Sequence, residues 1–450
     1  MENSKKPIFT VHHLLYFIFL SVIMTTDAGF DAPLLLKMEE VFGVNQLSIA
    51  FLISIMAIAG AAFLPLWGAI ADKVNRVRLI FIMILSGSII SLLTVFTISL
   101  RTDFWFFGLM RFLAVVINTA LGPAVFTLLV DLVPSKDRGG VFGWMGIAGT
   151  AAIGLGMTVS GIIPSLIYGN NFPLEFPFWF DFFAGLLYCG LTLTLREPER
   201  GSQDEGLEEL RKRGETYDYT FTLDEALDLF RRPINLKLFF FYFLLIIVNS
   251  ILGKLFILFL NVQHGVQTGL ATLMMFSIFG IQLIAQIFWG NMGDKKYREK
   301  KDGRLKVMIK ILGIGMCFMI PVFLIPFTFN YPAGIILFYI FAIVLAIGSF
   351  FIIGTHPNIG VIVADVNFPE VRATTNSIML LANTAATAIF IPIFTILAIY
   401  TPLNYSGTYF IFMLICFPLA FLILLSMRKS IIPNIERIQE ELRKRVTKEY

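Results

Sequence analysis

Two stretches of this 450-residue chain repeat one another: residues 67–78 read WGAIADKVNRVR, and residues 289–300 read WGNMGDKKYREK. Both open with Trp-Gly and carry an Asp-Lys pair beginning four residues after the glycine. The second copy starts 222 residues after the first. Another motif also repeats, as DLVPSKDR (131–138) and DVNFPEVR (365–372), with an offset of 234 residues. Two nearly equal offsets in one chain predict two homologous halves.

Composition assigns the chain to the membrane class. Hydrophobic residues make up 57% of the chain and charged residues 15%, whereas a soluble domain holds about 25% charged residues. Apolar stretches near 20 residues recur, long enough to cross a hydrocarbon core of about 30 Å. Twelve are expected: 13–36, 46–71, 77–100, 104–130, 141–166, 176–195, 237–261, 268–292, 306–328, 333–363, 373–399 and 407–427. We therefore expect an all-α membrane protein with twelve transmembrane helices in two pseudo-symmetric six-helix bundles.

The expected bundles occupy residues 1–195 and 237–427, joined by a cytoplasmic linker at 196–236 and followed by an amphipathic tail at 428–450. Basic residues orient them. With a cytoplasmic N-terminus, inner segments hold 30 of the 35 Lys and Arg residues, and outer loops hold two. Because cytoplasmic loops carry an excess of basic residues, this distribution predicts an integral, multi-pass protein with both termini in the cytoplasm.

The repeated motif suits a gate at the cytoplasmic edge. Gly68 has no side chain and allows a neighbouring helix to approach closely. A carboxylate at Asp72 gains from the dipole of a nearby helix N-terminus, and Arg76 can pair with another acidic helix end. The alternative is that these charges only signal topology. The candidate gate residues are Gly68, Asp72, Lys73, Arg76, Arg78, Asp131 and Arg138 in the first half, and Gly290, Asp294, Arg298, Asp365 and Arg372 in the second.

Twelve spans, two halves, a long central loop and the Gly68–Arg78 motif resemble the major facilitator superfamily over essentially the whole chain. The resemblance implies transport by rocking of the two halves around a central site. It also implies that Arg76 pairs with Asp131 to close the cytoplasmic side. By the repeat, Arg298 and Asp365 form the corresponding pair in the second half.

Within that superfamily, the first half is most similar to the spinster-like group. The similar stretches are TTDAGFDAPLLLKMEEVF (25–42), MRFLAVVINTALGPAVFTLLVDLVPSKDRGG (110–140) and REPERG (196–201). Ala28 stands where the group has Arg, Asn118 where it has an acid, and Asp31 where it is usually apolar. The resemblance implies an amphipathic or anionic substrate of lysolipid type, and these departures leave the coupling mechanism open.

Charges inside the predicted spans indicate function, because each costs about 2.5–3.5 kcal/mol or more at the bilayer centre. We expect Asp27 and Arg111 to form a coupling pair that gains or loses a proton during transport; the alternative is a static ion pair. Asp31 and Lys254 occupy nearly equivalent places in the two halves. They are expected to meet as an outer gate, or else to reach the outer interface separately.

Polar residues complete the candidate cavity. His356 precedes Pro357 in the tenth span and either shares proton traffic or packs through hydrogen bonds. Asp181, near the start of the sixth span, is expected at the outer interface. The coupling and cavity candidates are Asp27, Asp31, Arg111, Asn118, Lys254 and His356.

Other classes lack their motifs. The sequence has no Gly-x4-Gly-Lys-[Ser/Thr] phosphate loop, no metal-ligand spacing and no Gly-x-Ser-x-Gly elbow, so we expect no enzyme, cofactor or metal. The net charge of +4 reflects loops facing lipid headgroups and does not indicate nucleic acid. The partners expected are a small molecule, lipids and a coupling ion, a proton rather than sodium, with a monomer as the working unit. A proton-coupled multidrug or small-metabolite exporter, an organic-anion symporter and a non-transporting receptor remain alternatives.

Overall fold

The structure is a computed structural model that describes residues 10–71, 73–133, 138–198, 232–329, 331–367 and 372–448. Within these residues there are helices and no strand. Eleven helices are long and apolar enough to cross a membrane, and the shorter apolar helix at Phe176–Thr192 supplies the twelfth predicted span. The predicted all-α membrane fold is confirmed.

The chain divides into two compact units. The first unit comprises residues 1–219 with 268–273, and the second comprises 220–267 with 274–450. Most of the predicted linker, residues 199–231, lies outside the described residues. Helices of the first unit are α1 (Val11–Thr26), the 3-10 turn η1 (Asp27–Gly29), α2 (Asp31–Phe42), α3 (Gln46–Ala71), α4 (Arg76–Ser99), α5 (Phe104–Thr119), α6 (Leu121–Leu132), α7 (Arg138–Met157), the π-helical η2 (Thr158–Ile162), α8 (Ile163–Tyr168), the 3-10 turn η3 (Gly169–Asn171) and α9 (Phe176–Thr192).

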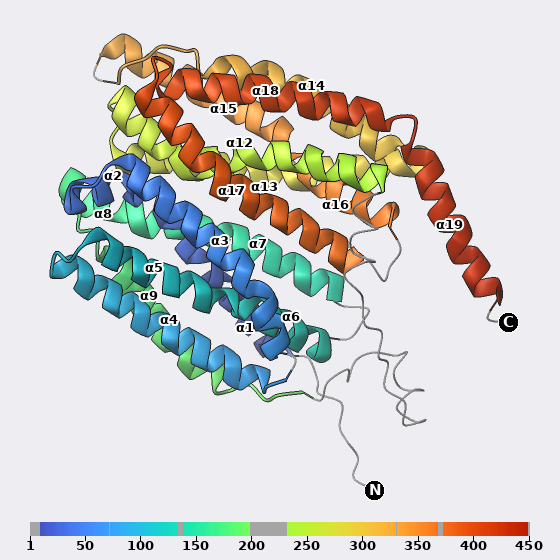
Figure 1. Ribbon diagram of the computed structural model, residues 1–450, viewed down its shortest axis with the longest axis horizontal. Coiled ribbons are helices and arrows are strands. Elements are labelled where there is room, and N and C mark those ends of the chain that lie inside the picture. Colours follow the sequence, from blue (N-terminus) through green and yellow to red (C-terminus); the bar gives the residue numbers. More distant parts are fainter. Residues whose placement is uncertain are drawn as a thin grey trace, which may run out of the picture. The chain divides into compact units, whose positions relative to one another are not determined.

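The second unit holds longer helices and the C-terminal helix (Figure 1). They are α12 (Pro233–His264), α13 (Thr268–Glu299), whose first residues cluster with the first unit, α14 (Gly303–Val322), α15 (Pro332–Ile353), α16 (Thr355–Asp365), α17 (Arg372–Tyr400), α18 (Asn404–Met427) and α19 (Ile431–Lys448). The predicted amphipathic tail is α19, which buries Ile431, Ile435 and Ile438. Lys301 Nζ holds it from the α13–α14 loop, 2.9 Å from Gln439 Oε1.

Both units repeat one local structure. In the first, the α5–α6 path is interrupted at Ala120, and in the second the α15–α16 path is interrupted at Gly354, 234 residues later. The repeated tryptophans also find equivalent partners. Trp67 Nε1 donates to the carbonyl of Val116 at 2.8 Å, and Trp289 Nε1 donates to that of Phe350 at 3.1 Å. The two halves therefore share this interruption and this hydrogen bond.

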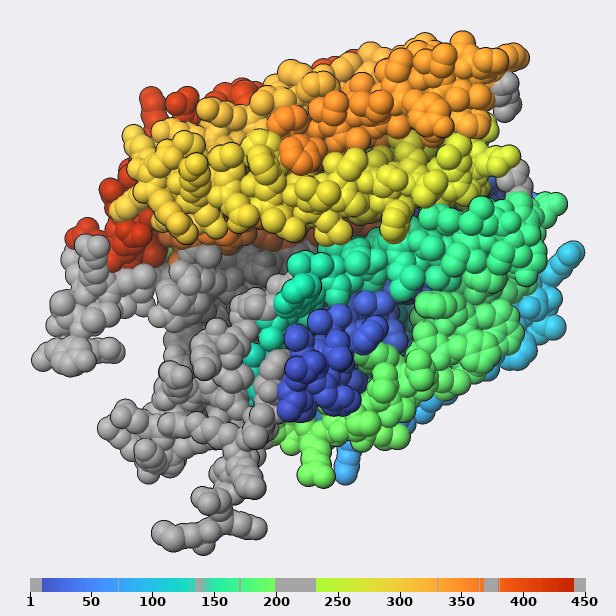
Figure 2. Space-filling model, turned by 180° about the vertical axis from the view of Figure 1, so that it is seen from behind, coloured from blue at the N-terminus to red at the C-terminus, as the bar shows by residue number. Residues whose placement is uncertain are grey.

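The first predicted span is broken where a continuous helix was expected. It is divided into α1, η1 and α2, and Asp27 opens the 3-10 turn. Figure 2 shows α1 in blue between α7 in teal and α9 in green. Close contact fixes the break: a Cβ on Gly29 would overlap the Ile153 carbonyl oxygen, and one on Gly156 would overlap that of Thr26. Glycine lets the two backbones touch and holds η1 against α7.

Candidate transport site and gate

Arg111 of α5 lies at the centre of a buried charged group. Its Nη2 lies 2.8 Å from Asp27 Oδ1 and 3.5 Å from Asp31 Oδ1. The side chain of Arg111 is 4% exposed, and its guanidinium lies 5.2 Å from the centre of the Phe178 ring. Burying a guanidinium is unfavourable unless opposite charge and hydrogen bonds replace its hydration, and both carboxylates supply them.

The 3-10 turn brings both acids to the same arginine. Asp27 begins η1 and Asp31 begins α2, and both side chains are buried. Residues four apart share one helix face, and the intervening turn keeps them together here. The sequence paired Asp27 with Arg111 and assigned Asp31 to a partner in the other half. In the structure Asp31 also lies beside Arg111.

A third carboxylate belongs to the same group. Asp181 of α9 accepts a hydrogen bond from Ser91 Oγ of α4, and it interacts electrostatically with Asp27 and Arg111. Its expected place at the outer interface stays a prediction, and the structure adds the hydrogen bond from α4. We call Asp27, Asp31 and Asp181 around Arg111 the carboxylate cluster. Three negative charges against one positive charge leave two negative charges when all four side chains are ionised.

The other three predicted cavity residues, Asn118, Lys254 and His356, are not part of the carboxylate cluster. Asn118 is half-buried on α5, where its Oδ1 would lie 3.5 Å from a Cβ added to Gly87. Lys254 is half-buried on α12 of the second unit, so its predicted pairing with Asp31 stays a prediction. His356 of α16 has Nε2 3.2 Å from Asn249 Nδ2 of α12. Its ring centre lies 5.9 Å from that of Tyr242.

At the other end of the first unit, Arg76 forms a compact ion-pair group. Its Nη1 donates to Asp131 Oδ2, the pairing that the resemblance implied, and its Nε lies 2.7 Å from Glu197 Oε1. Glu197 Oε2 also accepts from the backbone N–H of Val77 at 3.0 Å. The carboxylate therefore meets the N-terminus of α4 as well as the arginine. We call Arg76, Asp131 and Glu197 the Arg76 group.

Of the remaining motif residues of the first half, only some can be placed in the described part of the chain. Lys73 and Arg78 are exposed, while Asn75 caps α4 by accepting from the Arg78 backbone N–H at 2.8 Å. Asp72 lies outside the described residues, as does the side chain of Arg138, which begins α7. Gly68 was expected to permit a close helix contact. Among the described residues of its own unit, a Cβ added there would meet no heavy atom within 4 Å.

The second unit repeats the arginine group with a different residue from the one expected. Arg304 Nη1 lies 2.9 Å from Asp365 Oδ2, and Nη2 lies 2.7 Å from Asp294 Oδ1. Its guanidinium also lies 4.0 Å from the centre of the Tyr297 ring. Arg298, the predicted partner of Asp365, is exposed on α13. We call Arg304, Asp294 and Asp365 the Arg304 group.

Extra residues in the second half explain why Arg304, and not Arg298, pairs with Asp365. Arg76 is the first residue of α4 and Arg304 the second residue of α14, so each arginine starts the third long helix of its bundle. Helix α13 continues to Glu299, and the offset grows from 222 at the tryptophans to 234 at the aspartates. A constant offset therefore selected Arg298, six residues too early. Gly290 lies as predicted beside another helix, 3.5 Å from Pro357 for an added Cβ, and the Arg372 side chain lies outside the described residues.

Three residues of these groups, Glu197, Arg304 and Asp181, were not predicted from the sequence to belong to them. Glu197 stands in the REPERG stretch, which carried a family resemblance but no role. Arg304 could have been found from the change in offset between the two repeated motifs. Asp181 could have been found only by knowing that α9 packs on α4, since neither spacing nor charge relates it to Arg111.

Comparison with known proteins agrees with this architecture. The model of the Major Facilitator Superfamily matches residues 17–354. No curated protein sequence matches the chain. Among solved structures, a D-xylose-proton symporter has a TM-score of 0.69 at 13% identity, with 92% of this chain and 96% of that chain covered.

Two further solved structures have similar scores. A bacterial homologue of the human lysosomal transporter spinster, inward-facing and occupied, has a TM-score of 0.66 at 15% identity, with 94% of this chain and 96% of that chain covered. A peptide transporter in complex with alafosfalin has 0.66 at 14%, with 96% and 97% covered. Identities this low show the fold alone, but the family match covers most of the chain. The chain is an integral multi-pass membrane protein that belongs to the major facilitator superfamily.

Proposed function

We propose that the chain is a secondary active transporter that couples proton movement to transport of a small amphipathic or anionic organic molecule. The carboxylate cluster is the observation that supports it. Three acids and one arginine lie between the helices of the first unit, where apolar side chains would be enough for packing. Ionisable groups inside a membrane bundle are rare and mark ion or substrate pathways.

Charge balance favours the proton as coupling ion. Burying excess negative charge is unfavourable, and binding a proton relieves it without disturbing the packing. Protonation of Asp27 removes one of the two carboxylates that face Arg111, at 2.8 Å. The guanidinium then has a hydrogen-bonding position free for an anionic group of the substrate. Proton and substrate are thereby linked through one side chain.

The two arginine groups suit rocking of rigid bundles. The Arg76 group ties the start of α4 to the end of α6 and to the segment after α9. The Arg304 group ties the start of α14 to α13 and to the end of α16. Each group holds the helix ends of its own unit together. Units held in this way can move as bodies while a central site opens to one side and then to the other.

The coupling test uses purified protein in lipid vesicles. Thermal-shift screening of lysolipids, sphingoid phosphates, organic anions and cationic drugs first supplies a substrate, since a ligand that binds the folded state raises the unfolding midpoint. Uptake is then measured with and without an imposed pH gradient. We expect Asp27→Asn to keep substrate exchange but to lose gradient-driven accumulation down to the level of protein-free vesicles.

A control variant shows whether any loss of accumulation is specific to Asp27. Glu40→Gln removes a carboxylate that is 61% exposed in the same unit and should leave accumulation unchanged, because its ion pair is with Lys37 of the same helix and not with the carboxylate cluster. Accumulation in Asp27→Asn that still follows the pH gradient contradicts coupling at Asp27. Stabilisation by lysolipid that is lost in Arg111→Ala supports the amphipathic-anion substrate. Stabilisation by cations or neutral drugs that survives Arg111→Ala favours the multidrug alternative.

A further inference from the structure

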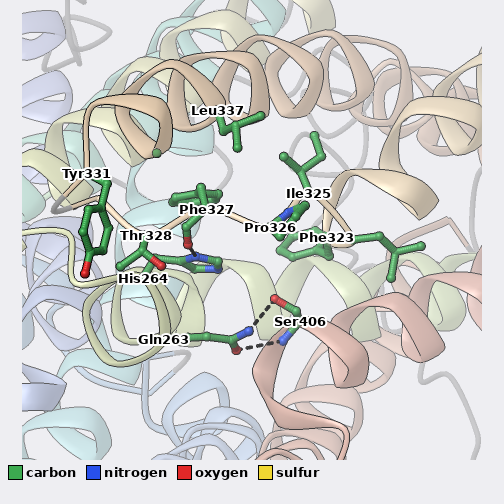
Figure 3. A pocket seen from close by; sticks show the side chains of 12 residues that line it. Gln263, His264, Phe323, Ile325, Pro326, Phe327, Thr328, Tyr331, Leu337 and Ser406 are labelled. Carbon is green, nitrogen blue, oxygen red and sulfur yellow. Dashed lines mark hydrogen bonds between the residues drawn. The ribbon is translucent and has the colours of Figure 1, made fainter.

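The second unit contains a cavity of about 500 Å³, and Figure 3 shows the side chains that line it. It is bounded by the end of α12, the segment after α14, the start of α15 and the start of α18. Arg304 stands at the opposite end of α14. The volume of the cavity falls in the range of small-molecule sites, roughly 300–1,000 Å³. Neither the carboxylate cluster nor the arginine groups contribute a residue to its wall.

One wall of the cavity holds a buried histidine with one unpaired ring nitrogen. His264 is 4% exposed, and its Nδ1 lies 2.7 Å from the carbonyl oxygen of Phe327. Since a carbonyl only accepts, Nδ1 carries the proton and Nε2 of the neutral ring is an acceptor. Among the described residues, Nε2 has no hydrogen-bond partner. An unpaired buried acceptor is unfavourable, and a donor entering the cavity relieves it.

Packing fixes the direction of this acceptor. The imidazole stacks on the Phe327 ring, with 3.8 Å between ring centres and 14° between planes, and meets the Phe259 ring at its edge. Figure 3 shows the imidazole between the Phe327 side chain and Gln263. A ring packed against two aromatic neighbours cannot swing to another partner without breaking these contacts.

A serine hydroxyl, held by the glutamine next to the histidine, adds a donor to the cavity. Gln263 donates from Nε2 to Ser406 Oγ at 2.7 Å, and its Oε1 accepts from the Ser406 backbone N–H at 3.0 Å. Both ends of the amide are therefore engaged within the protein. Ser406 Oγ accepts one bond and keeps its own O–H to donate. His264 thus offers an acceptor and Ser406 a donor, beside the hydroxyls of Thr328 and Tyr331 that also line the cavity, and an alcohol can satisfy this pattern.

The rest of the wall excludes charged ligands. Phe323, Pro326 and Leu337 supply apolar surface, and the residues that line the cavity in the described part of the chain include no Asp, Glu, Lys or Arg. An ionised head would lose its hydration with no opposite charge to replace it. We propose that this cavity binds the hydroxyl head of an uncharged amphiphile from the surrounding lipid, with the head donating to His264 Nε2 and accepting from Ser406.

The experiment labels the intact protein in lipid nanodiscs. The probe is a monoacylglycerol that carries a photoreactive diazirine close to the glycerol, and the comparison is the free fatty acid with the same group. We expect saturable labelling in residues 323–337, mapped by mass spectrometry, with the acid labelling about tenfold less. Loss of one hydrogen bond weakens binding by roughly tenfold, so His264→Phe, which keeps the ring stack, should weaken monoacylglycerol labelling by about that factor.

Two further variants keep the result interpretable. Leu337→Trp fills the cavity and leaves every hydrogen bond of His264 in place, so it should abolish labelling even if His264→Phe fails to fold. Ile343→Trp adds the same bulk to an exposed side of α15 and should change nothing. Labelling that spreads evenly over lipid-facing helices, or that survives Leu337→Trp, overturns the proposal. Equal labelling by acid and monoacylglycerol also overturns it. None of these outcomes depends on whether the chain transports protons.

Discussion

Among single residues, Arg76 combines an ion pair predicted from the motif, with Asp131, and a second ion pair that was not predicted, with Glu197. Its side chain is 2% exposed and contacts two acids, so its charge is compensated on both sides. Asp131 was available from the motif, but Glu197 also binds the Val77 N–H, so it joins the arginine to a helix N-terminus. Removing it leaves a buried cation with one partner in place of two.

We therefore predict that Glu197→Gln lowers stability by about 1–3 kcal/mol, the range for a buried group that loses a charged partner. The measurement is the thermal unfolding midpoint in detergent, followed by tryptophan fluorescence. Glu436→Gln is the matched control, because its 3.5 Å pair with Lys301 joins side chains that are 58% and 40% exposed. Exposed pairs contribute little, so its midpoint should not move. Equal midpoints for both variants would contradict a stabilising role for Glu197.

Which residues meet was only partly predictable. Asp27 with Arg111, and Arg76 with Asp131, followed from charge and motif. Arg304 did not, because a repeat read at a constant offset ignores the longer α13. Asp181 did not, because its approach to Arg111 depends on the crossing of α9 over α4. That crossing is close: a Cβ on Gly185 would overlap Ser88 Oγ. Helix crossings are set by packing, and packing has no spacing signature along the chain.

Among the helices, the crossing of α1 and α7 depends on two glycines whose backbones touch. We predict that Gly156→Ala destabilises the protein by at least about 1–3 kcal/mol, as overpacking of a close contact does. Its Cβ would overlap the Thr26 carbonyl and push η1 away from α7. Chemical unfolding and the midpoint of thermal unfolding both report it.

Gly190→Ala in α9 provides the comparison for this prediction. A Cβ there meets no described atom within 4 Å, so alanine should be neutral or stabilising by up to about 1 kcal/mol through helix propensity. A Gly156→Ala protein as stable as Gly190→Ala would show that the two backbones can separate freely. Because η1 carries Asp27, loss of stability in Gly156→Ala should be accompanied by weaker proton-driven uptake.

Hydropathy predicted where the helices lie but not where they break. The predicted ranges agree with the helices to within a few residues for most spans, because apolar length follows from the bilayer. The breaks at Asp27–Gly29 and Ala120 were not predicted. An apolar run has the same hydropathy in an α-helix and in a 3-10 turn, because hydropathy depends on the side chains and not on the backbone hydrogen bonds.

For the whole molecule, the distribution of basic residues predicts which side each loop faces. We expect single cysteines at Leu100→Cys and Lys429→Cys, in a background without Cys189, Cys317 and Cys416, to lie on opposite sides of the membrane. In intact cells, a membrane-impermeant maleimide should label Leu100→Cys and reach Lys429→Cys only after permeabilisation. Both positions are exposed, so failure to react reflects the membrane and not burial. The reverse pattern would invert the topology.

The two arginine groups differ in their contact with water, and this has a consequence for ionic strength. Around Arg76 the acidic side chains are 10% and 22% exposed, whereas Asp294 beside Arg304 is 52% exposed. Mobile ions screen exposed charges beyond about 8 Å at physiological salt and screen buried pairs much less. Rising salt should therefore loosen the helix ends of the second half before those of the first, although both halves carry the same repeated motif.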